Sequence, residues 1–326
     1  MQKYFLQIND IMNFTLLNYA LEQYNLQNKT ATLTGHNENM TFNVADLFIL
    51  RIHKSADVFN SDFLYKNLSR KEIHNTEMNL LNYLYNKGFN VQLPVLNKYG
   101  EYVSTLPDGT FATAVSRLEG KSADDNDLTI DYFRKLGALI ARFHNISTDF
   151  ISGNILKYDT ALCDILFCQL DKANSKEYFN NTHYNILTDI CSIIKEAFCT
   201  NGHKFTVVHG DVSPDNTLIT PHGLSLIDFS LSGIGHPMID VACIYSFIKN
   251  DAMRSAFEDA YTAGGGTVDK EMVNICYAFN ELMGILLHID KLSTESWFES
   301  WLDSLCAKVF IPAINGKDIL WNRLNE

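Results

Sequence analysis

Apolar and polar positions in the first part of the chain alternate as expected for short β-strands. Apolar runs separated by turn residues predict strands over Thr30–Leu33, Met40–Val44, Leu47–His53, Val91–Val95 and Phe111–Ser116. Apolar residues at helical spacing predict two helices in the same region, over Phe14–Tyr24 and Asn67–Lys87. The pattern therefore predicts a small sheet, accompanied by few helices, before residue 117.

Helical spacing dominates the rest of the chain. Helices are predicted from Ile130 onward, and over Tyr184–Phe198, Met238–Phe247, Met253–Thr262, Met272–Ile289 and Glu295–Val309. His144, near the end of the first of these helices, is interpreted as a structural residue. Strand character stops at Ser116 and a glycine follows at Gly120, so we place a domain boundary there. The predicted domains are residues 1–116 and 117–326.

One stretch in the second domain, Thr206–Ala242, departs from the helical pattern. A short apolar run ends at the turn His209-Gly210-Asp211, and two further strand-like runs follow, Thr217–Ile219 and Leu224–Ile227. Asp228 comes directly after the second run. A hairpin made from these runs is expected to bring Asp228 back beside the loop that carries Asp211 and Asn216.

Asp211, Asn216 and Asp228 carry the oxygen atoms that phosphoryl transfer from ATP requires. The reaction needs an acceptor for the hydroxyl proton and oxygen ligands that hold Mg²⁺ on the phosphates. The spacing D-x-x-x-x-N is that of the protein-kinase catalytic loop, and Asp228 occupies the place of the later DFG aspartate. A simpler interpretation is a hairpin whose Asp and Asn side chains only cap turns. The order and spacing of all three residues favour phosphoryl transfer.

The segments HGDVSPDN, LIDFS and GHPMIDVA resemble the aminoglycoside phosphotransferase and choline kinase-like family of small-molecule kinases. The resemblance implies an α+β, two-lobed protein-kinase-like fold, with a small β-sheet N-lobe and a larger, mainly helical C-lobe. It also implies that Asp211 is the catalytic base and that Asn216 and Asp228 are Mg²⁺ ligands. By the same resemblance, Asp240 is a structural residue that braces the catalytic loop.

The resemblance also assigns nucleotide-binding roles in the first domain. Gly35 and Asn39 lie in a turn that would cover the phosphates, although a single glycine does not make a G-x-G-x-x-G loop. Arg51 stands where kinases carry a lysine, and arginine can bind phosphate oxygens in a bidentate manner. Its implied partner is Glu77, with Glu72 as a competing candidate on the same helix. The alternative interpretation of Arg51 is an exposed arginine on an edge strand.

Composition limits the classes of partner and the compartment. The net charge of −12 argues against a nucleic-acid-binding protein, which needs a basic surface, and is compatible with a cationic substrate. The seven cysteines form no C-x-x-C pair and are interpreted as buried thiols in a reducing compartment. The N-terminus lacks a signal-peptide pattern, and the uninterrupted apolar runs are too short to span a bilayer. We therefore expect a cytoplasmic protein without a membrane partner.

The sequence thus predicts an ATP- and Mg²⁺-dependent phosphotransferase that acts on a hydroxyl of a small molecule. An aminoglycoside-like compound, an amino alcohol, a sugar and a hydroxy amino acid all remain open as substrates. An alternative is a catalytically weak regulatory module that binds nucleotide, which Arg51 and the glycine-poor turn keep open. A protein kinase is disfavoured, because the sequence lacks an Ala-Pro-Glu motif and leaves little room for an activation loop after Asp228.

Overall fold

The computed structural model describes residues 15–36, 39–54, 60–65, 68–150, 152–199 and 205–320. Their contacts form two compact units. The first contains the described residues of Met1–Phe59 and Leu68–Glu119, and the second those of Asn60–Asn67 and Gly120–Glu326. The short described segment at residues 60–65 thus belongs with the second unit, which the sequence pattern did not indicate. The domain boundary after residue 116 stays a prediction.

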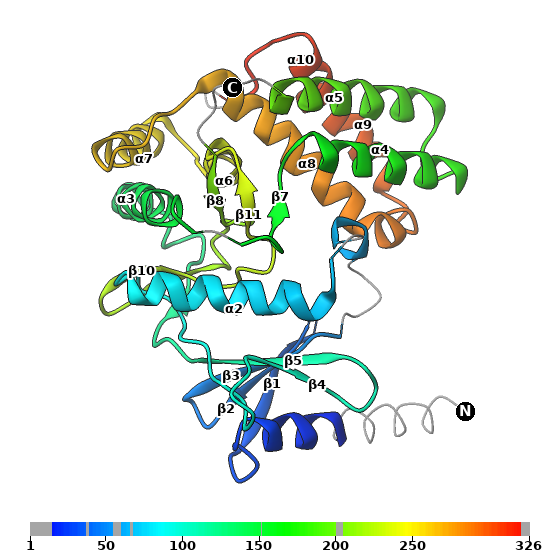
Figure 1. The fold of residues 1–326 in the computed structure, drawn as a ribbon. Coiled ribbons are helices and arrows are strands. Elements are labelled where there is room, and N and C mark those ends of the chain that lie inside the picture. The colour runs from blue at the N-terminus through cyan, green and yellow to red at the C-terminus, as the bar shows by residue number, and fades with distance from the viewer. Residues whose placement is uncertain are drawn as a thin grey trace. The chain divides into compact units, whose positions relative to one another are not determined.

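The first unit is built on a five-stranded antiparallel sheet (Figure 1). Its strand order is β1-β2-β3-β5-β4. The strands are β1 (Ala31–His36), β2 (Met40–Val44), β3 (Phe48–Ile52), β4 (Val103–Thr105) and β5 (Phe111–Ser116). Central strand β3 pairs Arg51 with Thr41 on one side and with Thr113 on the other. The predicted strands at 30–33, 40–44, 47–53 and 111–116 are confirmed to within a few residues.

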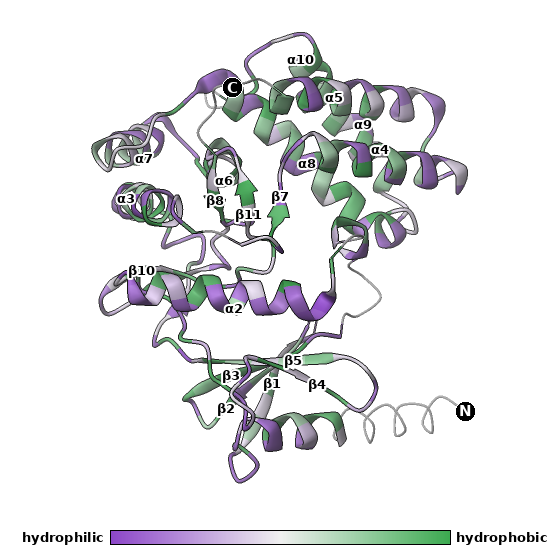
Figure 2. Cartoon of the chain, in the orientation of Figure 1, coloured by the Kyte–Doolittle hydropathy of each residue, from purple (hydrophilic) through white to green (hydrophobic). Residues whose placement is uncertain are grey.

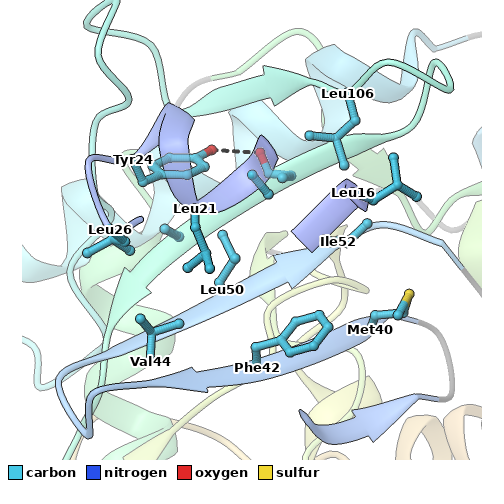
Figure 3. Packing of buried hydrophobic residues seen from close by; sticks show 13 residues of the cluster. Leu16, Leu21, Tyr24, Leu26, Met40, Phe42, Val44, Leu50, Ile52 and Leu106 are labelled. Atoms are coloured by element: carbon cyan, nitrogen blue, oxygen red, sulfur yellow. Dashed lines mark hydrogen bonds between the residues drawn. The ribbon is translucent and has the colours of Figure 1, made fainter. Parts of the chain in front are cut away.

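Alternating side chains explain how this sheet acquires one buried face. On β2, Met40, Phe42 and Val44 are buried, as period-two alternation requires. They belong to the same core as apolar residues of the helical segment 15–23, which agrees with the predicted first helix (Figure 3). Tyr24 anchors this segment, because its hydroxyl donates a hydrogen bond of 2.7 Å to the Ala112 carbonyl of β5.

Between α2 (Arg70–Asn86) and β4, the predicted strand Val91–Val95 is wrong. The structure has only an isolated bridge there, between Pro94 and Val115. In this bridge Ser116 N donates to the Leu93 carbonyl, so Pro94 takes a non-hydrogen-bonded position where its lack of an N–H is tolerated, and the pairing does not extend to a further residue. The neighbouring backbone still docks on β5, with Val95 N 2.9 Å from the Ala114 carbonyl oxygen.

The second unit is mainly helical, with two small three-stranded sheets (Figure 1). The strand orders are β10-β9-β6 and β7-β11-β8. The strands are β6 (Lys121–Ser122), β7 (Leu156–Lys157), β8 (Thr206–Val208), β9 (Thr217–Thr220), β10 (Gly223–Leu226) and β11 (Gly233–Gly235). The helices are α3 (Ile130–Ser147), α4 (Thr160–Ser175), α5 (Asn181–Cys199), α6 (Met238–Tyr245), α7 (Asp251–Ala263), α8 (Lys270–Leu292), α9 (Phe298–Leu305) and α10 (Ile311–Ile314), with a π-helical turn at Cys306–Phe310.

Amphipathic helices surround the interior of the second unit. Figure 2 shows apolar and polar stretches alternating along α4 and α5. Helices α3 and α7 pack along each other. Gly137 of α3 makes their close approach possible, because an added Cβ would collide with the Phe257 carbonyl oxygen.

Capping side chains fix several helix boundaries that periodicity alone left open. Helix α4 was not distinguished within residues 151–204 of the sequence, yet Asp159 caps it by accepting from Ala161 N and Leu162 N. Asn250 and Asp269 cap α7 and α8 in the same way. The predicted helix at 295–309 instead divides into α9 and the π-helical turn that follows it.

Helix α8 is the central helix of the second unit. By length and composition alone it could cross a membrane, with a best window of mean hydropathy 1.4, and 61% of that window is buried. It packs against α4, α5 and α6. These properties are those of the core helix of a globular unit.

The cysteines are only partly as predicted. All seven are free thiols, and four of them are buried. Cys168 and Cys199 are exposed and Cys243 is partly buried, so the prediction that all are buried is wrong. The exposed pair lies on α4 and at the end of α5, where the polar faces of amphipathic helices meet solvent.

Candidate active site

The loop between β8 and β9 carries Asp211 and Asn216 and holds them in direct contact. The Asn216 side-chain amide donates hydrogen bonds to the Asp211 carboxylate (Nδ2 to Oδ2, 2.7 Å) and to the Asp211 carbonyl (3.0 Å). Because Nδ2 faces Asp211, the amide oxygen of Asn216 is directed away from that carboxylate. Both side chains are partly buried.

Asp228 is delivered to this loop by the β9–β10 hairpin. Ile227 N donates to the Asn216 carbonyl (3.0 Å), which ties the end of the hairpin to the catalytic loop. Asp228 itself has φ +60°, in the left-handed region that aspartate tolerates better than most residues. Strained backbone of this kind is concentrated at functional sites. The structure therefore brings together the three residues that the sequence singled out.

The electrostatics of the site act mainly on Asp211. Burial raises the pKa of its carboxyl above the usual 3.8, and the charges of Asp228 and Asp240 add to this rise. His209 and the hydrogen bond from Asn216 oppose it. A carboxylate with a raised pKa is a better proton acceptor near neutral pH. Neighbouring like charges at Asp211 and Asp228 also favour a bound cation.

The donor set fits a hard divalent cation. Asp228 and Asn216 offer carboxylate and amide oxygens, which are the ligand types that Mg²⁺ and Ca²⁺ take. Within the described ranges, no group of three or more His, Cys, Asp or Glu side chains is placed to hold a metal. A site built from Asn and Asp oxygens, completed by phosphate oxygens of a nucleotide, needs no such group.

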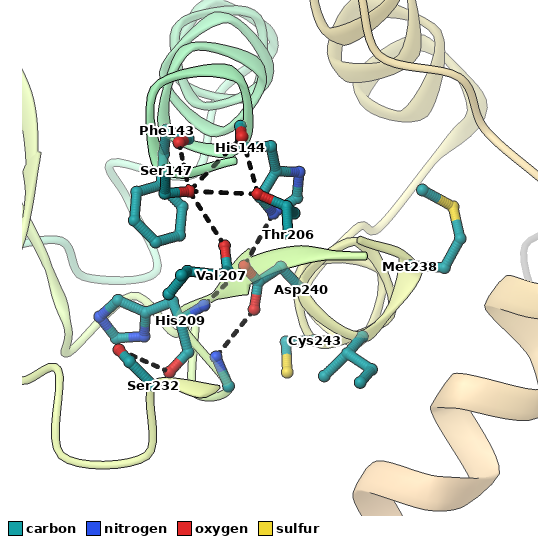
Figure 4. Close-up of polar contacts among 12 residues, drawn as sticks. Phe143, His144, Ser147, Thr206, Val207, His209, Ser232, Met238, Asp240 and Cys243 are labelled. Carbon is teal, nitrogen blue, oxygen red and sulfur yellow. Dashed lines mark hydrogen bonds and ion pairs between the residues drawn. The ribbon is translucent and has the colours of Figure 1, made fainter. Parts of the chain in front are cut away.

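Asp240 of α6 braces the backbone that precedes Asp211 (Figure 4). Its fully buried carboxylate accepts from His209 N and Gly210 N, both at 2.8 Å. It also accepts from His144 Nε2 of α3 at 2.9 Å. Three hydrogen bonds to one carboxylate thus join α3, α6 and the catalytic loop. These contacts agree with the structural roles that the sequence indicated for Asp240 and His144.

A second layer of hydrogen bonds fixes His144. Its Nδ1 lies 3.0 Å from the Tyr261 hydroxyl. Burial and the charge of Asp240 raise the pKa of Tyr261, so its hydroxyl stays protonated and donates a hydrogen bond to Nδ1. The backbone carbonyl of His144 accepts from Thr206 Oγ1 at 2.8 Å, which attaches α3 to β8 (Figure 4).

Steric constraints explain why a glycine occupies the middle of the His-Gly-Asp turn. Gly210 has φ +80°, and an added Cβ would collide with the Tyr158 hydroxyl and lie 2.5 Å from the Leu231 carbonyl oxygen. A larger residue such as the arginine of protein kinases cannot occupy this position. Tyr158, which donates to the Leu231 carbonyl at 2.5 Å, was not singled out from the sequence. The glycines that surround its ring, Gly210, Gly233 and Gly235, were the available signal.

Replacing this glycine should destabilise the second unit. The Gly210→Ala substitution combines a left-handed backbone with two collisions, so we expect the free energy of unfolding to fall by about 2–3 kcal/mol or more. Gly316→Ala is a matched control, because Gly316 has φ +63° in the same unit but open space around its Cβ. Denaturant unfolding of both variants measures the difference. Equal losses would show that Tyr158 and Leu231 do not restrict this position.

In the first unit, Arg51 and Glu77 form a buried ion pair. Arg51 NH2 lies 2.5 Å from Glu77 Oε1, and both residues are only 6% exposed. Glu72 is exposed, so the structure selects Glu77 among the two candidates. Arg51 lies on a central strand, and the alternative of an exposed edge-strand arginine is therefore wrong. Whether this pair binds nucleotide stays a prediction.

The ion pair is expected to contribute little net stability, because the cost of removing both charges from water offsets their attraction. Glu77→Ala alone leaves a buried guanidinium without its carboxylate and should cost about 3 kcal/mol. Replacing both residues, as Arg51→Met with Glu77→Leu, should recover most of that loss. Thermal unfolding of the single and double variants tests this. A double variant less stable than Glu77→Ala would contradict it.

The predicted phosphate-covering turn is partly described. Gly35 lies in β1 next to an irregularity in the pairing with β2, and open space surrounds its Cβ position. Asn39 precedes β2, and its Oδ1 lies 2.8 Å from His53 Nδ1. Residues 37 and 38 of the predicted turn lie outside the described residues. The nucleotide-binding roles of Gly35 and Asn39 stay predictions.

Comparison with known proteins gives a consistent result. The family model described as "Phosphotransferase enzyme family" matches residues 35–271. This range includes Arg51, Glu77, the catalytic loop and Asp240. No curated protein matches the sequence.

Solved structures similar to this chain are kinases of small molecules. An amicoumacin kinase in complex with AMP-PNP and Ca²⁺ has a TM-score of 0.70 and 17% identity, covering 94% of each chain. A microcompartment-associated aminopropanol kinase has a TM-score of 0.71 and 21% identity, covering 94% of this chain and 99% of the other. A choline/ethanolamine kinase family protein from Mesorhizobium loti has a TM-score of 0.57 and 14% identity, covering 88% and 92%. The predicted α+β, protein-kinase-like fold is confirmed.

Proposed function

The chain belongs to the phosphotransferase enzyme family and is a small-molecule kinase, and on this basis we propose that it transfers the γ-phosphate of ATP to a hydroxyl group in a Mg²⁺-dependent reaction. The observation that carries the proposal is the contact of Asn216 with Asp211, beside Asp228 and on a loop braced by Asp240. In phosphoryl transfer, catalysis is mainly positioning and electrostatic stabilisation, and this loop supplies both.

Asp211 receives or orients the acceptor hydroxyl. Its raised pKa suits it to take up the proton, and the hydrogen bond from Asn216 fixes the orientation of its carboxylate. If the transition state is loose, the same carboxylate acts by aligning the hydroxyl for attack. In either case, Asp240 sets its position through the backbone N–H groups of His209 and Gly210.

Asn216 and Asp228 hold Mg²⁺ in this proposal through their side-chain oxygens. When bound, Mg²⁺ neutralises the charge on the phosphate oxygens. Arg51, supported by Glu77, binds phosphate oxygens, and the turn with Gly35 and Asn39 covers them. Support for a nucleotide and a divalent cation comes from the similar amicoumacin kinase, whose structure holds AMP-PNP and Ca²⁺.

For the acceptor, we propose a small hydroxyl compound that carries an amine. The similar structures are named for amicoumacin, aminopropanol, choline or ethanolamine, and aminoglycosides. The net charge of −12 is compatible with a cationic substrate of this class. Sugars and hydroxy amino acids stay in the test panel because the sequence also allowed them.

The test is an assay of phosphate transfer from ATP with Mg²⁺ over amino alcohols, aminoglycosides, sugars and hydroxy amino acids. We expect transfer to at least one amine-bearing acceptor, abolished by EDTA and restored by excess Mg²⁺. Transfer only to amine-free sugars would overturn the acceptor class. ATP binding without transfer to any acceptor would instead favour a regulatory nucleotide-binding module.

A further inference from the structure

His53, directly after β3, makes two hydrogen bonds through its two ring nitrogens. Nδ1 lies 2.8 Å from Asn39 Oδ1, and Nε2 lies 2.9 Å from Thr113 Oγ1. A carboxamide oxygen can only accept, so Nδ1 carries the proton and Nε2 accepts from the Thr113 hydroxyl. Thr113 lies on β5 and is fully buried. A defined chain of hydrogen bonds therefore runs from the interior of the sheet through His53 to Asn39.

The ring of His53 also stacks on His74 of α2. The ring centroids are 3.5 Å apart and the ring planes differ by 18°. Burial, followed by the charges of His74, Arg51 and Arg70, lowers the pKa of His53 well below its usual value. Burial, followed by Arg51 and Arg70, lowers the pKa of His74 to about 3. Both rings are therefore neutral near pH 7 and can stack without charge repulsion.

The His53–His74 stack neighbours the Arg51–Glu77 ion pair on the same extended stretch of backbone and the same helix. Arg51 and His53 are two residues apart along the extended backbone, and His53 N still donates to the Phe111 carbonyl of β5 at 2.8 Å. Residues at this spacing share one face of a strand. On α2, His74 and Glu77 are three residues apart and share one face of the helix. Two side-chain contacts, Arg51–Glu77 and His53–His74, thus join β3 to α2.

We propose that His53 is a positioning residue for ATP binding, which rests on the proposed function. It holds the side chain of Asn39, which directly precedes β2, and its stack on His74 supports the helix that presents Glu77 to Arg51. A glycine-rich loop approaches phosphates with its backbone, which a turn with Gly35 as its single glycine cannot do to the same extent. A side chain held by the sheet, as that of Asn39 is, offers another way to position a hydrogen-bonding group for the phosphates.

The test measures the Kd for ATP with Mg²⁺ in His53→Phe, which keeps an aromatic ring on His74 but loses both hydrogen bonds. We expect the Kd to rise roughly five- to tenfold, as for the loss of one positioning hydrogen bond. Asn39→Ala should raise the Kd to a similar extent. The Kd of the double variant should be no higher than that of the single variant that binds ATP less tightly, because both substitutions break the same hydrogen bond between His53 and Asn39.

Tyr24→Phe is the matched control. It removes another buried hydroxyl that bonds β5, at Ala112, next to Thr113 on the strand. It should lower stability without changing the Kd for ATP. An unchanged Kd in His53→Phe or Asn39→Ala, an additive double variant, or an equal rise in Tyr24→Phe would each overturn the inference while leaving the proposed function intact. A wild-type protein that fails to bind ATP would overturn both.

Discussion

The Asp211→Asn variant is expected to lose turnover by a factor of about 10²–10⁴ while retaining its affinity for ATP. Asparagine preserves the shape of the side chain and an oxygen that can accept from Asn216 Nδ2. It cannot take up a proton from the acceptor hydroxyl. Steady-state kinetics with the best acceptor from the panel, together with the Kd for ATP, separate these two effects.

The same substitution should affect stability in a pH-dependent way. The pKa of Asp211 is raised in the folded protein, so its contribution to stability is present at low pH and is lost as pH rises through that raised pKa. The free energy of unfolding of Asp211→Asn, relative to wild type, should therefore increase as pH rises from the usual aspartate pKa of 3.8 through the raised pKa of Asp211. Urea unfolding at several pH values measures this change.

Asp215→Asn is the matched control for both measurements. Asp215 lies in the same loop but is exposed, so the same substitution should leave turnover and stability nearly unchanged. A fully active Asp211→Asn would contradict the role of Asp211. A stability difference that moves in wild type's favour with rising pH would contradict the raised pKa.

Asp240→Ala is expected to produce the largest loss of stability, about 3–5 kcal/mol. It leaves the buried backbone N–H of His209 and the partly buried N–H of Gly210 without their acceptor. It also removes the partner of His144 Nε2. Since each unsatisfied buried donor costs about 1–3 kcal/mol, these losses account for the expected size of the effect. Denaturant unfolding, followed by circular dichroism, provides the measurement.

A second Asp–His pair in the same unit supplies the control. Asp303 lies 2.7 Å from His183 Nε2, but its side chain is 68% exposed. Asp303→Ala should therefore cost only about 1 kcal/mol or less. Similar costs for Asp240→Ala and Asp303→Ala would show that burial of Asp240 does not strengthen its contacts. A destabilised but fully active Asp240→Ala would contradict its role in positioning Asp211.

The sequence pattern predicted the strands and the order of the site residues, because both depend on residues that are close together in the chain. Strand β2 alternates in burial, and the catalytic loop with the hairpin that follows it carries Asp, Asn and Asp in the expected order. The pattern was wrong for Val91–Val95, which makes a single bridge to β5 at Pro94 instead of a strand. How far this segment pairs depends on how it docks on β5, which its own residues do not specify. Helix α4 begins at a cap, Asp159, which periodicity does not detect.

Other features depend on contacts between residues far apart in the sequence. Glu72 and Glu77 were both candidates on one helix, and only the docking of α2 on the sheet separates a buried glutamate from an exposed one. The role of Tyr158 follows only from the structure, in which its side chain fills the space that Gly210, Gly233 and Gly235 leave open. His53 joins Asn39 and Thr113, which no spacing in the sequence relates.

Cation binding by Asn216 and Asp228 tests the account most directly. Mn²⁺ can replace Mg²⁺ as a paramagnetic probe, and its binding in the presence of AMP-PNP is measured by electron paramagnetic resonance. We predict that wild type binds Mn²⁺ with AMP-PNP and that Asp228→Asn and Asn216→Ala each weaken this binding at least about tenfold, the first through loss of the carboxylate charge and the second through loss of a ligand oxygen. Equal Mn²⁺ affinity in wild type and both variants would contradict the proposed site.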